Sequence, residues 1–211
     1  MKLKWYGHSC FAMTFENGTV LITDPFDGSM QYPLCTARAD IALVSHDHFD
    51  HNHVSSLSGN PAVIKTAGAH FANGIKITCV PSFHDAERGA KRGENLISII
   101  EADGLRIGHL GDLGHMPNEA QLQAIQNLDL MLIPIGGFFT IDTNQAIEII
   151  RKANPRCAIA MHFKNAYCDF PISDESQFRV ELNAEHLPNE IEITKTTPLP
   201  RAAIMAFKAE P

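Results

Sequence analysis

Residues 46–51, His-Asp-His-Phe-Asp-His, gather three histidines and two aspartates in six consecutive positions. Imidazole nitrogens and carboxylate oxygens are the ligands that Zn²⁺, Fe²⁺ and Mn²⁺ take from proteins. His46 and His48 are two residues apart, so in an extended segment they point the same way and can bind one metal. Asp50 and His51 follow where the chain must turn, so they can face a second metal. The spacing therefore predicts a metal site.

This motif stands directly after an apolar run, residues 41–44, which we predict to be a short buried strand. In open α/β architectures, ligands lie beyond the carboxyl ends of such strands. Other polar side chains also stand at the ends of apolar runs: His8, His84, His109, Asp112 and His162. Their recurrence predicts one edge where strand ends converge. A solvated His/Asp-rich loop is the alternative, but so dense a pattern at a strand end argues against it.

The remaining chain supplies the elements that must position these groups. Apolar patterning predicts strands at residues 3–7, 10–15, 19–23, 41–44, 62–64, 75–80, 96–100, 105–109, 128–133, 157–161, 191–193 and 203–207. Helices are predicted at residues 53–57, 118–127 with Asn118 as N-cap, 143–153, and within 170–182 with Ser173 or Asp174 as cap. Strands come first and then alternate with helices, which favours two helix-covered sheets over one doubly wound sheet.

Composition describes an ordinary globular protein, and we expect one domain over residues 1–211. The formal net charge is −7 and the chain has no Lys/Arg block, which argues against broad binding of nucleic acid. Lys91-Arg92 is the nearest approach to a basic patch. The five scattered cysteines, the lack of an apolar signal segment and the lack of a membrane-length apolar stretch favour a cytoplasmic protein. Whether copies of the chain form a homo-oligomer stays open.

The pattern His-x-His-x-Asp-His at residues 46–51 resembles the metal-binding motif of the metallo-β-lactamase superfamily. The Gly7-His8 segment and the string Leu-Ile-Pro-Ile-Gly-Gly-Phe-Phe-Thr at residues 132–140 resemble its branch of small stand-alone metal-dependent hydrolases, which includes the ascorbate-6-phosphate lactonase type. The resemblance covers nearly the whole chain. It implies an α/β (α+β) fold, an αββα sandwich of two mixed β-sheets flanked by helices, with the metal site at one edge.

The resemblance also implies a set of metal ligands. They are His46, His48 and His84 for the first metal, Asp50, His51 and His162 for the second, and Asp112 as the bridge. His109 rivals His84 because it too stands at a strand end. We favour His84, since His109 still lies within its strand pattern, and we expect His109 to orient a ligand. Asp24 is either a turn residue before Pro25 or the hydrogen-bond acceptor of a liganded imidazole.

Two divalent metal ions, Zn²⁺ foremost and Mn, Fe or Ni as alternatives, would make hydroxide available at neutral pH. The expected reaction is hydrolysis of a small-molecule ester, lactone or phosphodiester by that hydroxide. In this scheme Asp50 orients the hydroxide and carries a proton beside the bridging Asp112. His8, His109 and Thr140 are the candidates to stabilise the developing oxyanion.

Two other functions compete with hydrolysis. One is a di-iron oxidoreductase acting with a separate flavoprotein, because no flavin domain is fused to this chain. The other is a non-catalytic metal-binding regulatory protein, against which the complete ligand set argues. For the hydrolase, we expect the loops at residues 27–39, 86–94 and 165–173 to shape the substrate pocket.

Overall fold

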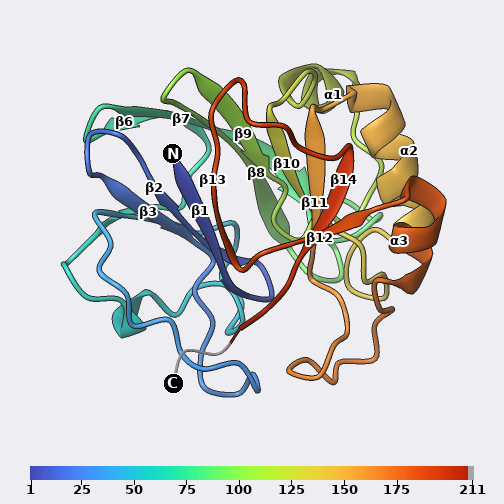
Figure 1. The fold of residues 1–211 in the computed structure, drawn as a ribbon. Coiled ribbons are helices and arrows are strands. Elements are labelled where there is room, and N and C mark those ends of the chain that lie inside the picture. The colour runs from blue at the N-terminus through green and yellow to red at the C-terminus, as the bar shows by residue number, and fades with distance from the viewer. Residues whose placement is uncertain (209–211) are drawn as a thin grey trace.

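Two mixed β-sheets make up the structure, a computed structural model that describes residues 1–208 (Figure 1). The first sheet has six strands in the order β13-β1-β2-β3-β4-β5. They are β1 (Lys2–Gly7), β2 (Cys10–Thr14), β3 (Val20–Thr23), β4 (Ile41–Leu43), β5 (Ala62–Ile64) and β13 (Glu190–Glu192). The strands from β13 to β3 pair antiparallel, whereas β3, β4 and β5 pair parallel.

The second sheet has eight strands in the order β12-β14-β11-β10-β9-β8-β7-β6. They are β6 (Gly68–Ala72), β7 (Ile75–Phe83), β8 (Glu94–Ala102), β9 (Leu105–His109), β10 (Leu130–Pro134), β11 (Cys157–Met161), β12 (Glu185–Leu187) and β14 (Ala202–Met205). In this order, the strands from β12 to β9, β14 included, pair parallel, and the strands from β9 to β6 pair antiparallel. One buried core joins side chains of both sheets, such as Leu3, Phe11, Ile77 and Leu132. The predicted two-sheet architecture is confirmed.

Tight turns join two pairs of neighbouring antiparallel strands. β2 and β3 pair antiparallel around Asn17-Gly18, and β8 and β9 around Asp103-Gly104. Asp103 and Gly104 have φ of 50° and 70°, the left-handed values that a two-residue type I′ hairpin turn requires at both positions. The turn chemistry therefore sets the register of β8 against β9.

Helical cover is unequal between the two sheets. Helix α1 (Glu119–Ala124) contacts β7, α3 (Ser176–Leu182) contacts β14, and α2 (Thr143–Ala153) lies between α1 and α3 (Figure 1). Beside the first sheet, the described chain has only the 3₁₀ helix η1 (Val54–Ser56), which corresponds to the short helix predicted at residues 53–57. The predicted sandwich of two mixed sheets flanked by helices is thus confirmed, with α1 and α3 against the second sheet and η1 beside the first.

Three local features differ from what the sequence predicted: two strands and one helix cap. β6 and β12 were not predicted, because both are short edge strands with largely exposed residues and no apolar alternation. The N-cap of α3 is Glu175, not Ser173 or Asp174. Asn118 does cap α1, in a reciprocal capping box with Gln121.

Strand ends from both sheets carry the polar residues singled out above. Asp24 follows β3, the motif at residues 46–51 follows β4, and His84 follows β7. Asp112 follows β9 and His162 follows β11. The predicted convergence of strand ends is therefore the fold's means of collecting these groups.

The five cysteines are free and buried. None of the helices within residues 1–208 is long and apolar enough to cross a membrane.

Candidate metal centre

The Asp112 carboxylate lies among four imidazoles. Its Oδ2 is 3.1 Å from His84 Nε2, 3.2 Å from His162 Nε2, 3.3 Å from His51 Nε2 and 3.9 Å from His46 Nε2. The aspartate is 1% exposed. This buried carboxylate thus faces histidines from the loops after β4, β7 and β11.

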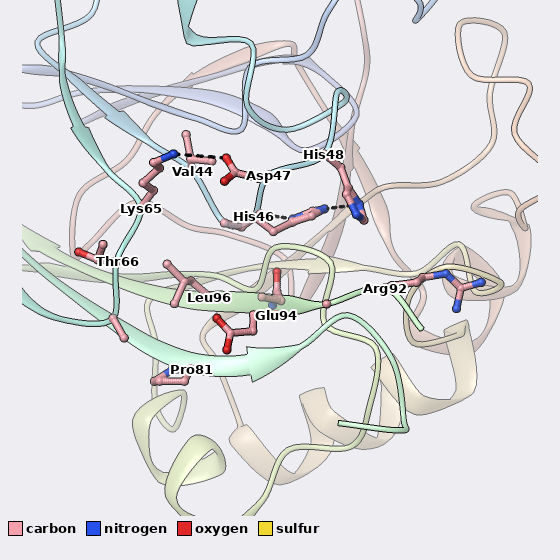
Figure 2. A pocket seen from close by; sticks show the side chains of 14 residues that line it. Val44, His46, Asp47, His48, Lys65, Thr66, Pro81, Arg92, Glu94 and Leu96 are labelled. Atoms are coloured by element: carbon pink, nitrogen blue, oxygen red, sulfur yellow. Dashed lines mark hydrogen bonds and ion pairs between the residues drawn. The ribbon is translucent and has the colours of Figure 1, made fainter. Parts of the chain in front are cut away.

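Three groups of side chains present ligand atoms that all lie within 4.8 Å of one another. They are His46, His48 and His84; His46, His51 and Asp112; and His8, Asp50, His51 and His162. The seven residues predicted as metal ligands thus meet in one place, with His8 beside them. Within the first group, His46 Nε2 is 3.0 Å from His48 Nδ1 (Figure 2).

The donor set fits divalent metal ions. His51 Nε2 and Asp112 Oδ1 are buried and make no hydrogen bond of good geometry, and the same is true of both ring nitrogens of His8. Leaving a buried polar atom unpaired costs about 1–3 kcal/mol, more for a charged one. Imidazole nitrogens and carboxylate oxygens gathered in this state are suited to a cation such as Zn²⁺.

Burial sets the protonation of His8 and His46. Burial, reinforced by the neighbouring His162, lowers the pKa of His8 to about 4. Burial, reinforced by His51, lowers the pKa of His46 to about 3. Both imidazoles are therefore neutral at pH 7, which is the form that binds a metal. Burial alone would raise the pKa of Asp112, but His162 and His51 outweigh it and hold that pKa well below its usual value.

Asp24 holds two residues of the motif in place. Its Oδ2 accepts a hydrogen bond from His51 Nδ1 at 2.8 Å and one from Ser45 Oγ at 2.7 Å, and its Oδ1 accepts from Ser45 N at 2.8 Å. With Nδ1 protonated, Nε2 is the nitrogen of His51 left to bind a metal. Of the two roles open from sequence, the structure thus shows Asp24 as an imidazole acceptor.

Asn95 fixes the turn that carries Asp112. Its Oδ1 accepts from Asp112 N at 2.9 Å, while its Nδ2 donates to Leu110 O at 3.0 Å. Gly111 between them has φ of 53°, and a Cβ there would lie 2.3 Å from Asn95 Oδ1. Only glycine lets the chain pass this close to Asn95.

His109 does not reach the cluster. Its Nε2 donates to Ser9 O at 2.9 Å, and its Nδ1 accepts from Gly111 N at 3.2 Å. Both ring nitrogens are thus used by the backbone. The structure brings His84 to His46 and His48, and it leaves His109 outside the three groups of ligand atoms.

A cavity of about 480 Å³ opens over the cluster. Its lining residues are Asp47, His48, Phe49, Asp50, His84, Arg92, Asp112, Phe139, His162 and Phe170. His8, His109 and Thr140, which the sequence suggested as oxyanion donors, do not line it, and the Thr140 hydroxyl donates to Ile141 O. The predicted pocket loops contribute Arg92 and Phe170, whereas residues 27–39 contribute nothing to the lining.

The sequence did not single out Arg92 or the three phenylalanines as site residues. In the sequence, Lys91-Arg92 is only the nearest approach to a basic patch, and Phe139 is part of the string at residues 132–140. A second cavity of about 590 Å³ adjoins the first and shares Asp47, His48 and Arg92 with it (Figure 2).

Comparison with known proteins shows which family has this fold and this site. A family model described as the beta-lactamase superfamily domain matches residues 2–162. A UPF0173 metal-dependent hydrolase of Archaeoglobus fulgidus is 28% identical, in an alignment that covers 92% of this chain and 96% of that protein. A Thermotoga maritima structure, described as a candidate Zn-dependent hydrolase of the metallo-β-lactamase superfamily, is 34% identical, covers 97% of each chain and gives a TM-score of 0.82.

Fold and site together define a metal-dependent hydrolase with the metallo-β-lactamase fold. The chain belongs to the beta-lactamase superfamily, as the resemblance of the motif at residues 46–51 implied.

Proposed function

We propose that the protein is a binuclear hydrolase that cleaves an ester, lactone or phosphodiester bond in a small molecule. The observation that carries the proposal is Asp112, which stands between two sets of ligand atoms. The first set is His46, His48 and His84, and the second is Asp50, His51 and His162. Two sets around a shared carboxylate suit two ions, and zinc suits the imidazole-rich donors best.

Divalent ions held by these residues would supply Lewis acidity and lower the pKa of bound water. Asp50 lines the cavity and is the carboxylate placed to orient the attacking water and accept its proton. Burial would raise the pKa of Asp50, but His51 and His8 outweigh it and lower that pKa far below its usual value. Asp50 is therefore ionised at neutral pH, as a proton acceptor must be.

His8 lies behind Asp50 instead of at the cavity wall. Its Nε2 is 3.3 Å from Asp50 Oδ2, and its ring centroid is 4.2 Å from that of His162. We therefore propose that His8 packs behind Asp50 and does not reach the substrate as an oxyanion donor. His109 supports Ser9 and Gly111 through the backbone contacts given above, and its role is also positioning.

A small-molecule substrate fits the cavity, because ligand pockets of this kind typically enclose about 300–1,000 Å³. The test is the metal content of the purified protein, followed by a panel of esters, lactones and phosphodiesters at neutral pH. We expect two metal ions per chain and hydrolysis of one substrate class. Fully metal-loaded protein that hydrolyses none of them would contradict the proposal, and bound iron with visible absorption would redirect it to redox chemistry.

Asp112→Asn tests the bridge. An amide lacks the charge needed between two cations, so we expect the variant to bind at most one ion and to lose at least about 10³-fold in kcat/KM. Metal analysis and circular dichroism on the same sample separate metal loss from misfolding. Two bound ions with full activity would remove Asp112 from this role.

A further inference from the structure

A row of phenylalanine rings forms one wall of the cavity over the metal centre. Ring centroids are 6.4 Å apart for Phe49 and Phe170, 6.0 Å for Phe170 and Phe139, and 4.7 Å for Phe139 and Phe138. Phe49, Phe139 and Phe170 line the cavity, and Phe138 extends the row beyond it. These rings follow β4, β10 and β11, so three separate loops build the wall.

The two outer rings of the row are open to solvent, while Phe139 and Phe170 are half-buried. Phe49 is 51% exposed and Phe138 is 66% exposed, although large apolar side chains gain most by burial. Phe138 also has φ of 59°, a left-handed conformation that costs free energy in any residue with a Cβ. Exposed apolar patches and strained backbone both gather at binding sites. A ligand with an apolar body would cover these rings.

Arg92 stands against the same wall. Its Cζ is 5.3 Å from the ring centroid of Phe139 and 5.9 Å from that of Phe138. It is the one Lys or Arg among the residues that line the cavity. Within residues 1–208, no Asp or Glu forms an ion pair with it. Figure 2 shows the side chain extending away from Glu94 and from Asp47, the nearest acidic residues drawn there.

The nearby carboxylates are engaged elsewhere. Asp47 pairs with Lys65 at 3.5 Å and accepts from Asn52, while Asp50 and Asp112 lie among the histidines. The guanidinium is thus a cation without an anion at the mouth of a metal site. Stacking on rings also leaves the N–H edge of the guanidinium free to form two parallel hydrogen bonds with a carboxylate or a phosphate.

Asp85 fixes the loop that presents Arg92. Its two carboxylate oxygens accept hydrogen bonds from four backbone N–H groups, those of Glu87, Gly89, Lys91 and Arg92, at 2.7–2.9 Å. The backbone of Arg92 is therefore held in place before any ligand arrives, which reduces the entropy lost on binding.

We infer that the substrate of this hydrolase has two parts besides the bond that is cleaved. An apolar group, aromatic or of similar width, packs on Phe139 and Phe170. An anionic group, a carboxylate or a phosphate, pairs with Arg92. The inference rests on the proposed function, because it takes the metal centre as the place of cleavage.

The kinetic test uses metal-loaded protein and four 4-nitrophenyl esters. Two are neutral, the esters of acetic acid and of 3-phenylpropionic acid. The other two are esters of 3-phenylpropionic acid that carry a carboxylate or a phosphate on the phenyl ring. We expect at least tenfold higher kcat/KM for one anionic ester than for the neutral aromatic ester, and the preferred anion identifies the group. Arg92→Gln should reduce that preference below twofold, and Arg92→Lys should retain part of it. Lys91→Gln, which removes the adjacent exposed cation, should leave it unchanged.

A second pair of variants tests the rings. Phe139→Ala should reduce the preference for the phenylpropionyl ester over the acetyl ester at least fivefold. Phe71→Ala is the matched control, because Phe71 is 77% exposed on β6 and does not line the cavity. An anion preference that survives Arg92→Gln, or an aromatic preference that survives Phe139→Ala, would overturn the corresponding half of the inference.

A binding arm separates this inference from the proposed function. Calorimetry measures 3-phenylpropionate, its neutral amide and phenylphosphonate binding to the metal-loaded wild type and to Arg92→Gln. We expect an anion to bind the wild type at least tenfold more tightly than the amide, and the difference to vanish in the variant. If no ester is cleaved but this pattern is seen, the proposed hydrolysis fails while the ligand class stands. Anion binding of equal strength in both proteins would place the anion on the metals and overturn the inference.

Discussion

His84 and His109 differ in what their ring nitrogens contact. His84 points its Nε2 at Asp112, 3.1 Å away, whereas His109 uses both nitrogens on backbone groups. We expect His84→Ala to bind about one metal ion fewer per chain, because it removes a ligand of the first metal. His109→Ala should keep both ions while losing about 1–3 kcal/mol of unfolding free energy, because it leaves buried backbone groups unpaired. Metal analysis and urea unfolding of the two variants check this, and the reverse pattern would exchange their roles.

Asp24 acts through the residues it holds. It accepts from His51 Nδ1 and twice from Ser45, and an asparagine has only one oxygen to serve these donors. We expect Asp24→Asn to lower the affinity for the second metal about 10–100-fold, the usual effect of removing the partner of a ligated imidazole. Competition with a chelator measures the affinity. The control is Asp27→Asn, a half-buried position whose side chain accepts from Ser29, and it should leave the affinity unchanged. An unaltered affinity in Asp24→Asn would mean that Asp24 only forms the turn before Pro25.

At the scale of elements, the sequence predicted what local patterns encode. Helix α2 and strand β11 match their predicted ranges to the residue, because each has a complete apolar pattern and clear ends. Strands β6 and β12 lack such a pattern, since edge strands can pair with exposed, polar side chains. Their existence depends on a neighbouring strand, which no local window contains.

The candidate site also has residues that the sequence revealed and residues that it did not. Residues 46–51 were found because their density and position after a strand are properties of one segment. Arg92 and Phe139 were missed because their significance is a contact between loops far apart in the chain. Neither has a motif, and only Asp85 and its four backbone donors bring the arginine to the wall.

Gly114 packs against the backbone of the loop that carries His84, so its side chain must stay small. A Cβ at this position would lie 2.3 Å from the carbonyl carbon of His84 and 2.4 Å from Asp85 N, both backbone atoms that cannot rotate away. We expect Gly114→Ala to lower the unfolding free energy by about 1–3 kcal/mol and to weaken binding of the first metal, because the clash displaces the His84 loop. Gly28→Ala is the matched control, since a Cβ there meets nothing within 4 Å. Equal stability and equal metal affinity for the two variants would contradict this account.

Across the whole molecule, the metal cluster and the substrate cavity have different origins. The cluster is collected by strand ends of both sheets, so it follows from the fold itself. The cavity wall comes from the loops after β4, β10 and β11 and before β8. Loops tolerate change far better than a sheet core does. The same fold can therefore keep its metal chemistry while the loops select another substrate.

The concentration of buried histidines makes the metal-free protein sensitive to acid. In the folded state the pKa of His8 is lowered to about 4 and that of His46 to about 3, chiefly by burial, whereas both are near 6.5 when unfolded. Below pH 6.5 the unfolded chain takes up protons that the folded chain does not, so acid favours unfolding. His51 shifts the other way, because nearby carboxylates outweigh burial and raise its pKa. Its stabilising contribution is complete below pH 6.5 and is lost only as the pH rises above that value.

We therefore expect the unfolding free energy of chelator-treated protein to fall by about 1–4 kcal/mol between pH 6.5 and pH 5. The buried Asp112 carboxylate does not offset this fall. Its pKa is lowered in the folded state, so the stability that it contributes is lost only below its pKa in the unfolded chain, near 4. Urea unfolding at the two pH values measures the difference. His46→Ala should reduce it by removing one of the histidines whose pKa burial lowers, and His53→Ala should not, because His53 lies outside the cluster. A free energy that stays level or rises toward pH 5 would mean that these imidazoles are not held neutral by the fold.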